Sequence, residues 1–249
     1  NPMMIYPAIH YTMGGIWVDY ELMTSIKGLF AIGECNFSDH GANRLGASAL
    51  MQGLADGYFV LPYTIQNYLA DQITVPRFST DLPEFAAAEK AIQEKINWMM
   101  NIKGKKSVDS IHKELGHVMW EYVGMGRTAE GLKTGIAKLK EIRKEFEKDL
   151  FIPGDKEGMN VELDKAIRLY DFIIMGELVA YDALNRNESC GGHFREEYQT
   201  EEGEAKRDDE NFFYVACWEY QGSDEKAPEL LKEPLVYEAI KVQTRNYKS

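Results

Sequence analysis

The strongest constraint on the fold is a series of four amphipathic segments between residues 84 and 187. Within each segment apolar side chains recur every three or four residues, and lysine and glutamate lie between them. This spacing gives an α-helix one apolar face, which is stable only when it packs against another element. Together the segments predict an antiparallel bundle of three to four helices, similar to a spectrin repeat. They cover residues 84–101, 107–123, 128–150 and 161–187.

A first unit, residues 1–75, precedes the bundle and is separated from it by the proline-flanked linker Pro76–Pro83. The apolar run Ala31–Gly33 predicts a short buried strand that ends in a glycine turn. From Ala47 to Ala70 the apolar spacing predicts a long helix. Pro62 is expected to kink or break this helix, because proline lacks a backbone N–H.

The last part of the chain, residues 188–249, has a different composition. A charged, glycine-containing stretch at 201–210 predicts a loop. The runs 212–218 and 235–242 are rich in aromatic and β-branched residues and predict strands. The expected fold is therefore mainly α, with a small β-containing tail after the bundle. The expected domains are residues 1–75, 84–187 and 188–249.

Charge and cysteine usage narrow the function classes. The formal net charge of −12 disfavours nucleic acid as a partner, because its phosphates would be repelled. No apolar run reaches the roughly 18 residues of a membrane-spanning helix, and no targeting segment is expected after Asn1. Cys35, Cys190 and Cys217 are far apart, so neither a disulfide framework nor a metal site is expected. A reducing compartment fits this pattern best.

Three blocks within the first fifty residues suit the binding of an anionic ligand. They read Tyr-Pro-Ala-Ile-His-Tyr-Thr-Met-Gly-Gly at 6–15, Gly-Leu-Phe-Ala-Ile-Gly-Glu at 28–34 and His-Gly-Ala-Asn-Arg-Leu-Gly-Ala-Ser-Ala-Leu at 40–50. Arg44 is able to hold a carboxylate through two parallel hydrogen bonds, and His10 supplies a further donor. The glycines let the backbone approach a ligand closely. Each feature alone is typical of an ordinary loop, but their order and proximity favour a binding site.

The three blocks resemble the C-terminal half of the succinate dehydrogenase/fumarate reductase flavoprotein subunit. The resemblance implies that His10 and Arg44 bind the dicarboxylate substrate, succinate or fumarate. It also implies that Glu34 binds the ribose of FAD and that Ala49 and Leu50 bind the flavin through their backbone. A helix that starts near Ala47 would support this last role, because its positive end stabilises the anionic edge of a reduced flavin.

A second resemblance to this family lies after the bundle. Glu188–Arg195 reads Glu-Ser-Cys-Gly-Gly-His-Phe-Arg and is followed by Arg207–Glu210, which reads Arg-Asp-Asp-Glu. The family more often has arginine at Cys190 and alanine at Gly192, and the spacer is longer here. For His193 and Arg195 we therefore predict that they brace the bundle against the flavin domain, and a place near the cofactor stays open for His193.

The resemblance further implies parts that this sequence does not contain. The Gly-x-Gly-x-x-Gly turn for the FAD pyrophosphate, the family's proton-donating arginine and the histidine that attaches FAD do not occur. No catalytic residue is therefore expected in this fragment, which alone should hold FAD weakly and be inactive. The implied partners are an iron–sulfur subunit and a membrane cytochrome b subunit, which would hold the protein peripherally at the cytoplasmic face of the inner membrane.

Two alternatives remain open. L-aspartate oxidase carries similar blocks and a similar helical domain, although the extended tail at 235–247 fits a complex-forming subunit better. The fragment itself could also serve as a non-catalytic module for assembly with partner subunits. The direction of the reaction in the cell does not follow from the sequence.

Overall fold

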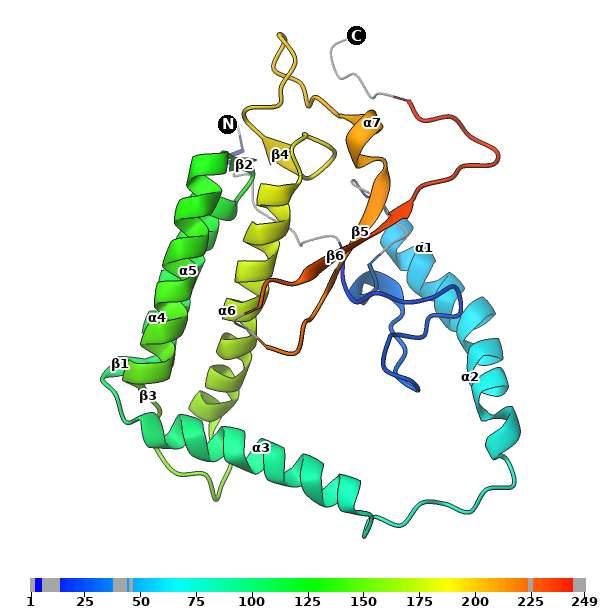
Figure 1. The fold of residues 1–249 in the computed structure, drawn as a ribbon. Helices are drawn as coiled ribbons and strands as arrows, with labels where there is room; N and C mark the ends of the chain where they lie inside the picture. Colours follow the sequence, from blue (N-terminus) through cyan, green and yellow to red (C-terminus); the bar gives the residue numbers. More distant parts are fainter. Residues whose placement is uncertain (1–2, 6–13, 38–43, 45–46, 224–225, 244–249) are drawn as a thin grey trace. The chain divides into compact units, whose positions relative to one another are not determined.

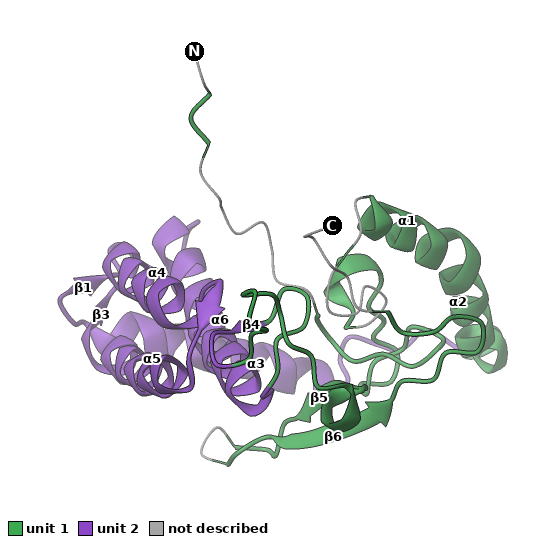
Figure 2. Ribbon diagram, turned by 90° about the horizontal axis from the view of Figure 1, so that it is seen from above, with its two compact units in different colours: residues 1–75, 188–193, 198–249 green, residues 76–187, 194–197 purple. Residues whose placement is uncertain are grey.

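The computed structural model describes residues 3–5, 14–37, 44, 47–223 and 226–243 (Figure 1). The chain forms two compact units (Figure 2). Unit 1 comprises residues 1–75, 188–193 and 198–249, and unit 2 comprises residues 76–187 and 194–197. Helices dominate the described residues, which confirms the mainly α fold. The three-domain division given above stays a prediction.

Unit 2 contains the four helices that the apolar spacing predicts. Three of the four have capped first turns, in which the side chains of Ser107, Thr128 and Asn160 accept hydrogen bonds from backbone N–H groups three residues later. The helices are α3 (Pro83–Ile102), α4 (Val108–Val123), α5 (Ala129–Asp149) and α6 (Val161–Asn185). Two short parallel pairs join their ends: β1 (Lys106–Ser107) with β3 (Leu150–Phe151), and β2 (Gly126–Arg127) with β4 (Phe194–Arg195).

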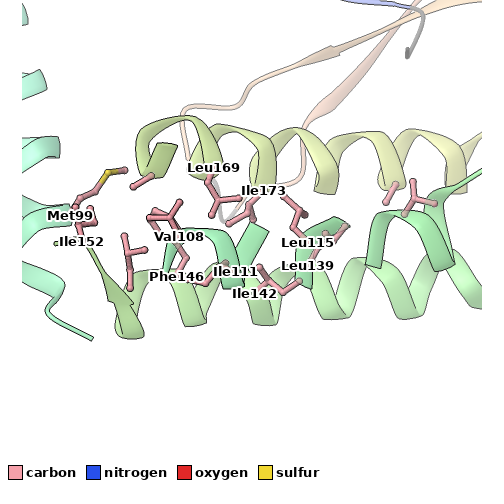
Figure 3. Close-up of a cluster of buried hydrophobic side chains, with 14 of the residues drawn as sticks. Met99, Val108, Ile111, Leu115, Leu139, Ile142, Phe146, Ile152, Leu169 and Ile173 are labelled. Carbon is pink, nitrogen blue, oxygen red and sulfur yellow. The ribbon is translucent and has the colours of Figure 1, made fainter. Parts of the chain in front are cut away.

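The core of unit 2 lies between α4, α5 and α6 (Figure 3). Each of these helices buries the apolar face that its sequence predicts, and each fully buried large side chain contributes about 1.5–3 kcal/mol. No helix in the described parts of the chain is both long and apolar enough to cross a membrane. The labelled core residues are Met99, Val108, Ile111, Leu115, Leu139, Ile142, Phe146, Ile152, Leu169 and Ile173.

Helix α3 packs less fully than its sequence predicts. Met99 is completely buried, but Phe85 and Ile92 on the same predicted stripe are 50% and 60% exposed. Figure 1 shows the cause: α3 crosses the end of the other three helices and does not lie along them. Only its last turns therefore reach the core, and the prediction that its whole apolar stripe is buried is wrong.

Three charged side chains close helix termini at the opposite end of the bundle. Arg195 is only 2% exposed, and its Nη1 donates to the carbonyl of Ala183 at 3.0 Å in the last turn of α6. Arg127 Nε donates to the carbonyl of Val123 at 3.0 Å at the end of α4. Glu197 accepts the first N–H of α5, from Ala129, and a hydrogen bond of 3.1 Å from Arg195 Nε. The two arginines lie at C-terminal helix ends, which carry partial negative charge, and Glu197 lies at an N-terminal end, which carries partial positive charge.

Glu197 makes the stability of this end depend on pH. Partial burial raises the pKa of Glu197, but the hydrogen bonds from Ala129 and Arg195 outweigh that effect, so its pKa lies below the usual value. The stabilisation is therefore complete above the unfolded-state pKa of about 4.3 and is lost as the pH falls through the lower folded-state value. We expect Glu197→Gln to lower the Tm most near neutral pH, and the gap from the wild type to close towards pH 3.

Thermal unfolding followed by circular dichroism measures this gap. Glu141→Gln is the matched control, because Glu141 is an exposed glutamate on α5. A gap that stays constant from pH 7 to pH 3 would show that the Glu197 carboxylate does not stabilise the end of the bundle.

Unit 1 contains the long helical arm predicted from Ala47 to Ala70. It consists of α1 (Ser48–Ala55), a π-helical turn η2 (Asp56–Val60), α2 (Leu61–Leu69) and a short 3-10 turn η3 (Ala70–Gln72). The interruption precedes Pro62, as predicted, because the proline ring clashes with the carbonyl four residues earlier and offers it no N–H. A widened turn relieves both problems without ending the helix.

The strand predicted at Ala31–Gly33 is not formed. Ile32 is extended, with φ −125° and ψ 155°, but Ala31 makes a single backbone hydrogen bond of 3.1 Å to the carbonyl of Leu22. A strand requires a ladder of such bonds, whereas the neighbouring segment turns away at Leu22, where φ is 66°. Ala31 is nevertheless buried as predicted, together with Val18 and Leu22.

The tail forms one antiparallel hairpin. The first predicted strand is present as β5 (Tyr214–Glu219), after the short helix α7 (Asp209–Phe212), and it pairs with β6 (Glu229–Pro234). The second strand was predicted at 235–242, which is wrong: those residues form no strand. The register explains the difference. Glu219 pairs with Glu229 and Tyr214, the first residue of β5, pairs with Pro234, so no residue of β5 is left to pair with 235–242.

Candidate cofactor and substrate site

The carboxylate of Glu34 is carried on a tight 3-10 turn, η1 (Gly33–Cys35). Gly33 has a φ of +67°, a conformation that favours glycine. The turn closes through a 3.1 Å hydrogen bond from the Asn36 N–H to the Gly33 carbonyl. The side chain of Glu34 is 42% exposed, so it is accessible to a ligand.

The glycine pair of the first block packs against this turn. The N–H of Ile16 donates to the carbonyl of Cys35 at 2.8 Å. A Cβ atom on Gly15 would lie 2.1 Å from the same carbonyl oxygen, which no packing could accommodate. Gly15 is therefore required for the close approach of the two segments.

Arg44 and Glu34 form an ion pair, in which Arg44 Nη1 lies 2.9 Å from Glu34 Oε1. The resemblance assigns these residues to different ligands, and the structure brings them together. The pair is partly exposed and is worth about 0.2–1 kcal/mol, so a ligand carboxylate could readily compete for the arginine. A guanidinium also has five N–H donors in a planar fork and is able to contact two carboxylates.

Ala49 and Leu50 lie in the first turn of α1. The N-cap residue, Ala47, has no capping side chain and adopts a left-handed conformation with φ 64°. Ala49 is buried and Leu50 is 71% exposed. The helix packs against η1, so its positive end lies in the same unit as Glu34.

The remaining candidates from the sequence are placed differently. His10 lies outside the described residues. His193 forms a tight turn, in which its N–H and carbonyl exchange hydrogen bonds of 3.0 and 2.8 Å with Cys190. Arg195 caps α6 within unit 2, as described above. The proposed role of these two residues in bracing the bundle against the flavin domain stays a prediction.

Sequence reasoning missed two polar residues that support the site. Gln52 and Asp56 lie four residues apart on the buried side of the helical arm, and each is less than a tenth exposed. Asp56 Oδ2 accepts the Gly33 N–H at 2.9 Å, and Gln52 Nε2 donates to Asn36 Oδ1 at 3.1 Å. The available signal was their i, i+4 spacing inside an otherwise apolar pattern.

The described residues suit two parts of FAD. The partly exposed Glu34 carboxylate, on a glycine turn, has the acceptor oxygens that ribose hydroxyls require. The start of α1, where the N-cap Ala47 has no capping side chain, carries the backbone N–H groups and positive potential that suit an anionic ring edge. Among the residues that the structure describes, no group of three or more His, Cys, Asp and Glu side chains is arranged to hold a metal ion.

Known proteins are similar to this chain in sequence and in fold. The family model described as "Fumarate reductase flavoprotein C-term" matches residues 112–247, and the FAD binding domain model matches residues 1–50. The chain is 36% identical to the fumarate reductase flavoprotein subunit of Proteus vulgaris over 217 residues, which cover 85% of this chain and 34% of that protein. It is 34% identical to the succinate dehydrogenase flavoprotein subunit of Bacillus subtilis over 197 residues, which cover 79% and 33%.

A solved structure of Escherichia coli quinol fumarate reductase is also similar. Its TM-score is 0.74 at 26% identity, over 94% of this chain and 38% of that one. The chain thus spans about a third of the length of the two relatives above. Because one family model matches more than half of the chain and the FAD binding domain matches its first fifty residues, the chain belongs to the FAD-dependent succinate dehydrogenase/fumarate reductase flavoprotein family.

Proposed function

We propose that this chain is part of the flavoprotein subunit of a succinate:quinone oxidoreductase, which interconverts succinate and fumarate. The observation that supports this most is the Arg44–Glu34 pair beside the uncapped start of α1. It combines a carboxylate-binding group with two FAD-binding features in one unit, in a chain whose relatives are succinate dehydrogenase and fumarate reductase flavoproteins.

Each candidate residue has a distinct role in this proposal. Arg44 and His10 hold the two carboxylates of the substrate and keep its central carbon–carbon bond in place. Glu34 binds the ribose hydroxyls of FAD, and the backbone N–H groups of Ala49 and Leu50 face the pyrimidine edge of the flavin. Bound FAD supplies the hydride transfer chemistry. The proton-donating group is not among these residues.

The domain roles follow the same family pattern. Residues 1–75 act as the C-terminal part of the FAD-binding domain, residues 84–187 as the helical bundle domain and residues 188–249 as the tail. An iron–sulfur subunit accepts the electrons, and a membrane cytochrome b subunit holds the complex at the cytoplasmic face of the inner membrane. The name of the E. coli relative, quinol fumarate reductase, supports a quinone as the final partner.

A second role applies to the fragment alone. The family model that covers residues 112–247 includes most of the bundle and the tail, which contain none of the proposed ligand-binding residues. We propose that these parts act mainly in assembly with the partner subunits. The 249-residue chain by itself would then neither retain FAD tightly nor turn over.

The test compares the 249-residue chain with the full-length flavoprotein that contains it. Both are incubated with FAD, freed of unbound FAD by gel filtration and supplied with succinate and an artificial dye. We expect bound FAD and fumarate formation in the full-length protein, and neither in the short chain. Fumarate formation by the short chain would contradict the assembly role, and its absence from both would contradict the proposed reaction.

A further inference from the structure

The helical arm of unit 1 exposes several large apolar side chains and buries polar ones. Among its apolar side chains, Leu50 and Tyr58 are 71% and 73% exposed. The buried side instead carries Gln52, Asp56 and Thr64, each less than a tenth exposed. Burying a carboxylate or amide is costly unless its hydrogen bonds are satisfied, so this side of the arm must have specific polar partners.

Those partners flank the turn that carries Glu34. Asp56 Oδ2 accepts the N–H of Gly33 at 2.9 Å, immediately before Glu34. Gln52 Nε2 donates to the side chain of Asn36 at 3.1 Å, two residues after it. One face of α1 and the π turn therefore holds η1 at both ends, and Glu34 lies between the two attachment points.

The hydrogen bond to Asp56 is made by Gly33, a residue of the turn with a positive φ. Gly33 is buried and has a positive φ of 67°, a conformation that residues other than glycine rarely adopt. The hydrogen bond to Asp56 holds the peptide between Ile32 and Gly33, at the point where the turn that carries Glu34 begins. The π turn matters because Asp56 is its first residue and such turns often occur at functional sites.

From these contacts we infer that Asp56 is a positioning residue for FAD, which acts by holding the Gly33–Glu34 turn so that the Glu34 carboxylate meets the ribose. The inference rests on the proposed role of Glu34. It does not require Asp56 to touch the cofactor.

The experiment is a double-mutant cycle on FAD affinity in the full-length flavoprotein, with the apoprotein titrated by flavin fluorescence quenching. Asp56→Leu, which leaves the Gly33 N–H buried without an acceptor, is expected to raise the Kd for FAD about tenfold. Glu34→Gln is expected to have an effect of similar size. If Asp56 acts through Glu34, the Kd of the double variant should be close to the larger of the two single-variant Kd values. Independent effects would instead multiply.

Two controls separate positioning from general destabilisation. Asp56→Asn keeps an oxygen acceptor and should remain within about threefold of the wild-type Kd. Asp71→Leu removes an exposed aspartate of the same arm and should change the Kd less than twofold. Hydrogen exchange by mass spectrometry over residues 30–37 should be faster in Asp56→Leu and close to normal in Asp56→Asn.

The inference is overturned if the effects of Asp56→Leu and Glu34→Gln on the Kd multiply. It is also overturned if Asp56→Asn binds FAD as weakly as Asp56→Leu, or if Glu34→Gln leaves the Kd unchanged. The proposed reaction is tested separately, because the cycle needs no substrate. A wild-type protein that shows the expected cycle but forms no fumarate from succinate would contradict the reaction and leave the positioning role intact.

Discussion

Arg44→Ala is expected to lower kcat/KM for succinate about 30-fold or more in the full-length flavoprotein. The reason is the loss of the guanidinium that holds one substrate carboxylate, an interaction usually worth at least 2 kcal/mol. FAD content should change little, because the ion pair that joins Arg44 to the turn of Glu34 is partly exposed and therefore weak. The assay is succinate-dependent dye reduction, with bound FAD measured by its absorbance.

Arg168→Ala is the matched control for this prediction. Arg168 is an exposed arginine on α6 whose Nε lies 3.1 Å from Asp164, and it belongs to unit 2. Its removal should leave kcat/KM within twofold of the wild type. Arg44→Lys should fall between the two, because it keeps the charge and loses the two-pronged geometry. Wild-type kcat/KM in Arg44→Ala would exclude Arg44 from the dicarboxylate site.

Arg195→Met is expected to lower the free energy of unfolding by about 3 kcal/mol. The substitution keeps an unbranched side chain of similar length, but it leaves the last carbonyls of α6 and the Glu197 carboxylate without their buried cationic donor. Urea unfolding followed by circular dichroism at 222 nm reports this loss, because the four long helices of unit 2 dominate the signal.

The comparison variant is Arg168→Met, which changes an exposed arginine of the same helix. It should cost less than about 0.5 kcal/mol, as is usual for surface positions. If Arg195→Met and Arg168→Met unfold at the same urea concentration, the buried arginine does not hold the end of the bundle.

The bundle was predictable because its information is local. Apolar spacing located α4, α5 and α6, and the observed bounds differ from the predicted ones by at most two residues. The partial packing of α3 depends on the angle at which it crosses the bundle, which no local pattern encodes. The position of β6 likewise depends on its pairing with β5, and aromatic content alone favoured the wrong segment.

The candidate site was predictable only in part. The three motif blocks drew attention to Glu34 and Arg44, but their ion pair depends on how two loops fold together. The support from Asp56 was invisible because an acidic residue in a helix is normally assigned to its exposed side. The ligand-binding roles of all five candidates stay predictions: His10, Glu34, Arg44, Ala49 and Leu50.

The most direct test of the proposed function is a comparison of two substrates in the full-length flavoprotein reconstituted with FAD. Succinate-dependent dye reduction is measured without oxygen, and L-aspartate-dependent peroxide formation is measured in air. The account predicts that succinate is converted to fumarate and that L-aspartate yields no peroxide. Peroxide formation from L-aspartate without succinate oxidation would contradict it and identify the protein as an L-aspartate oxidase.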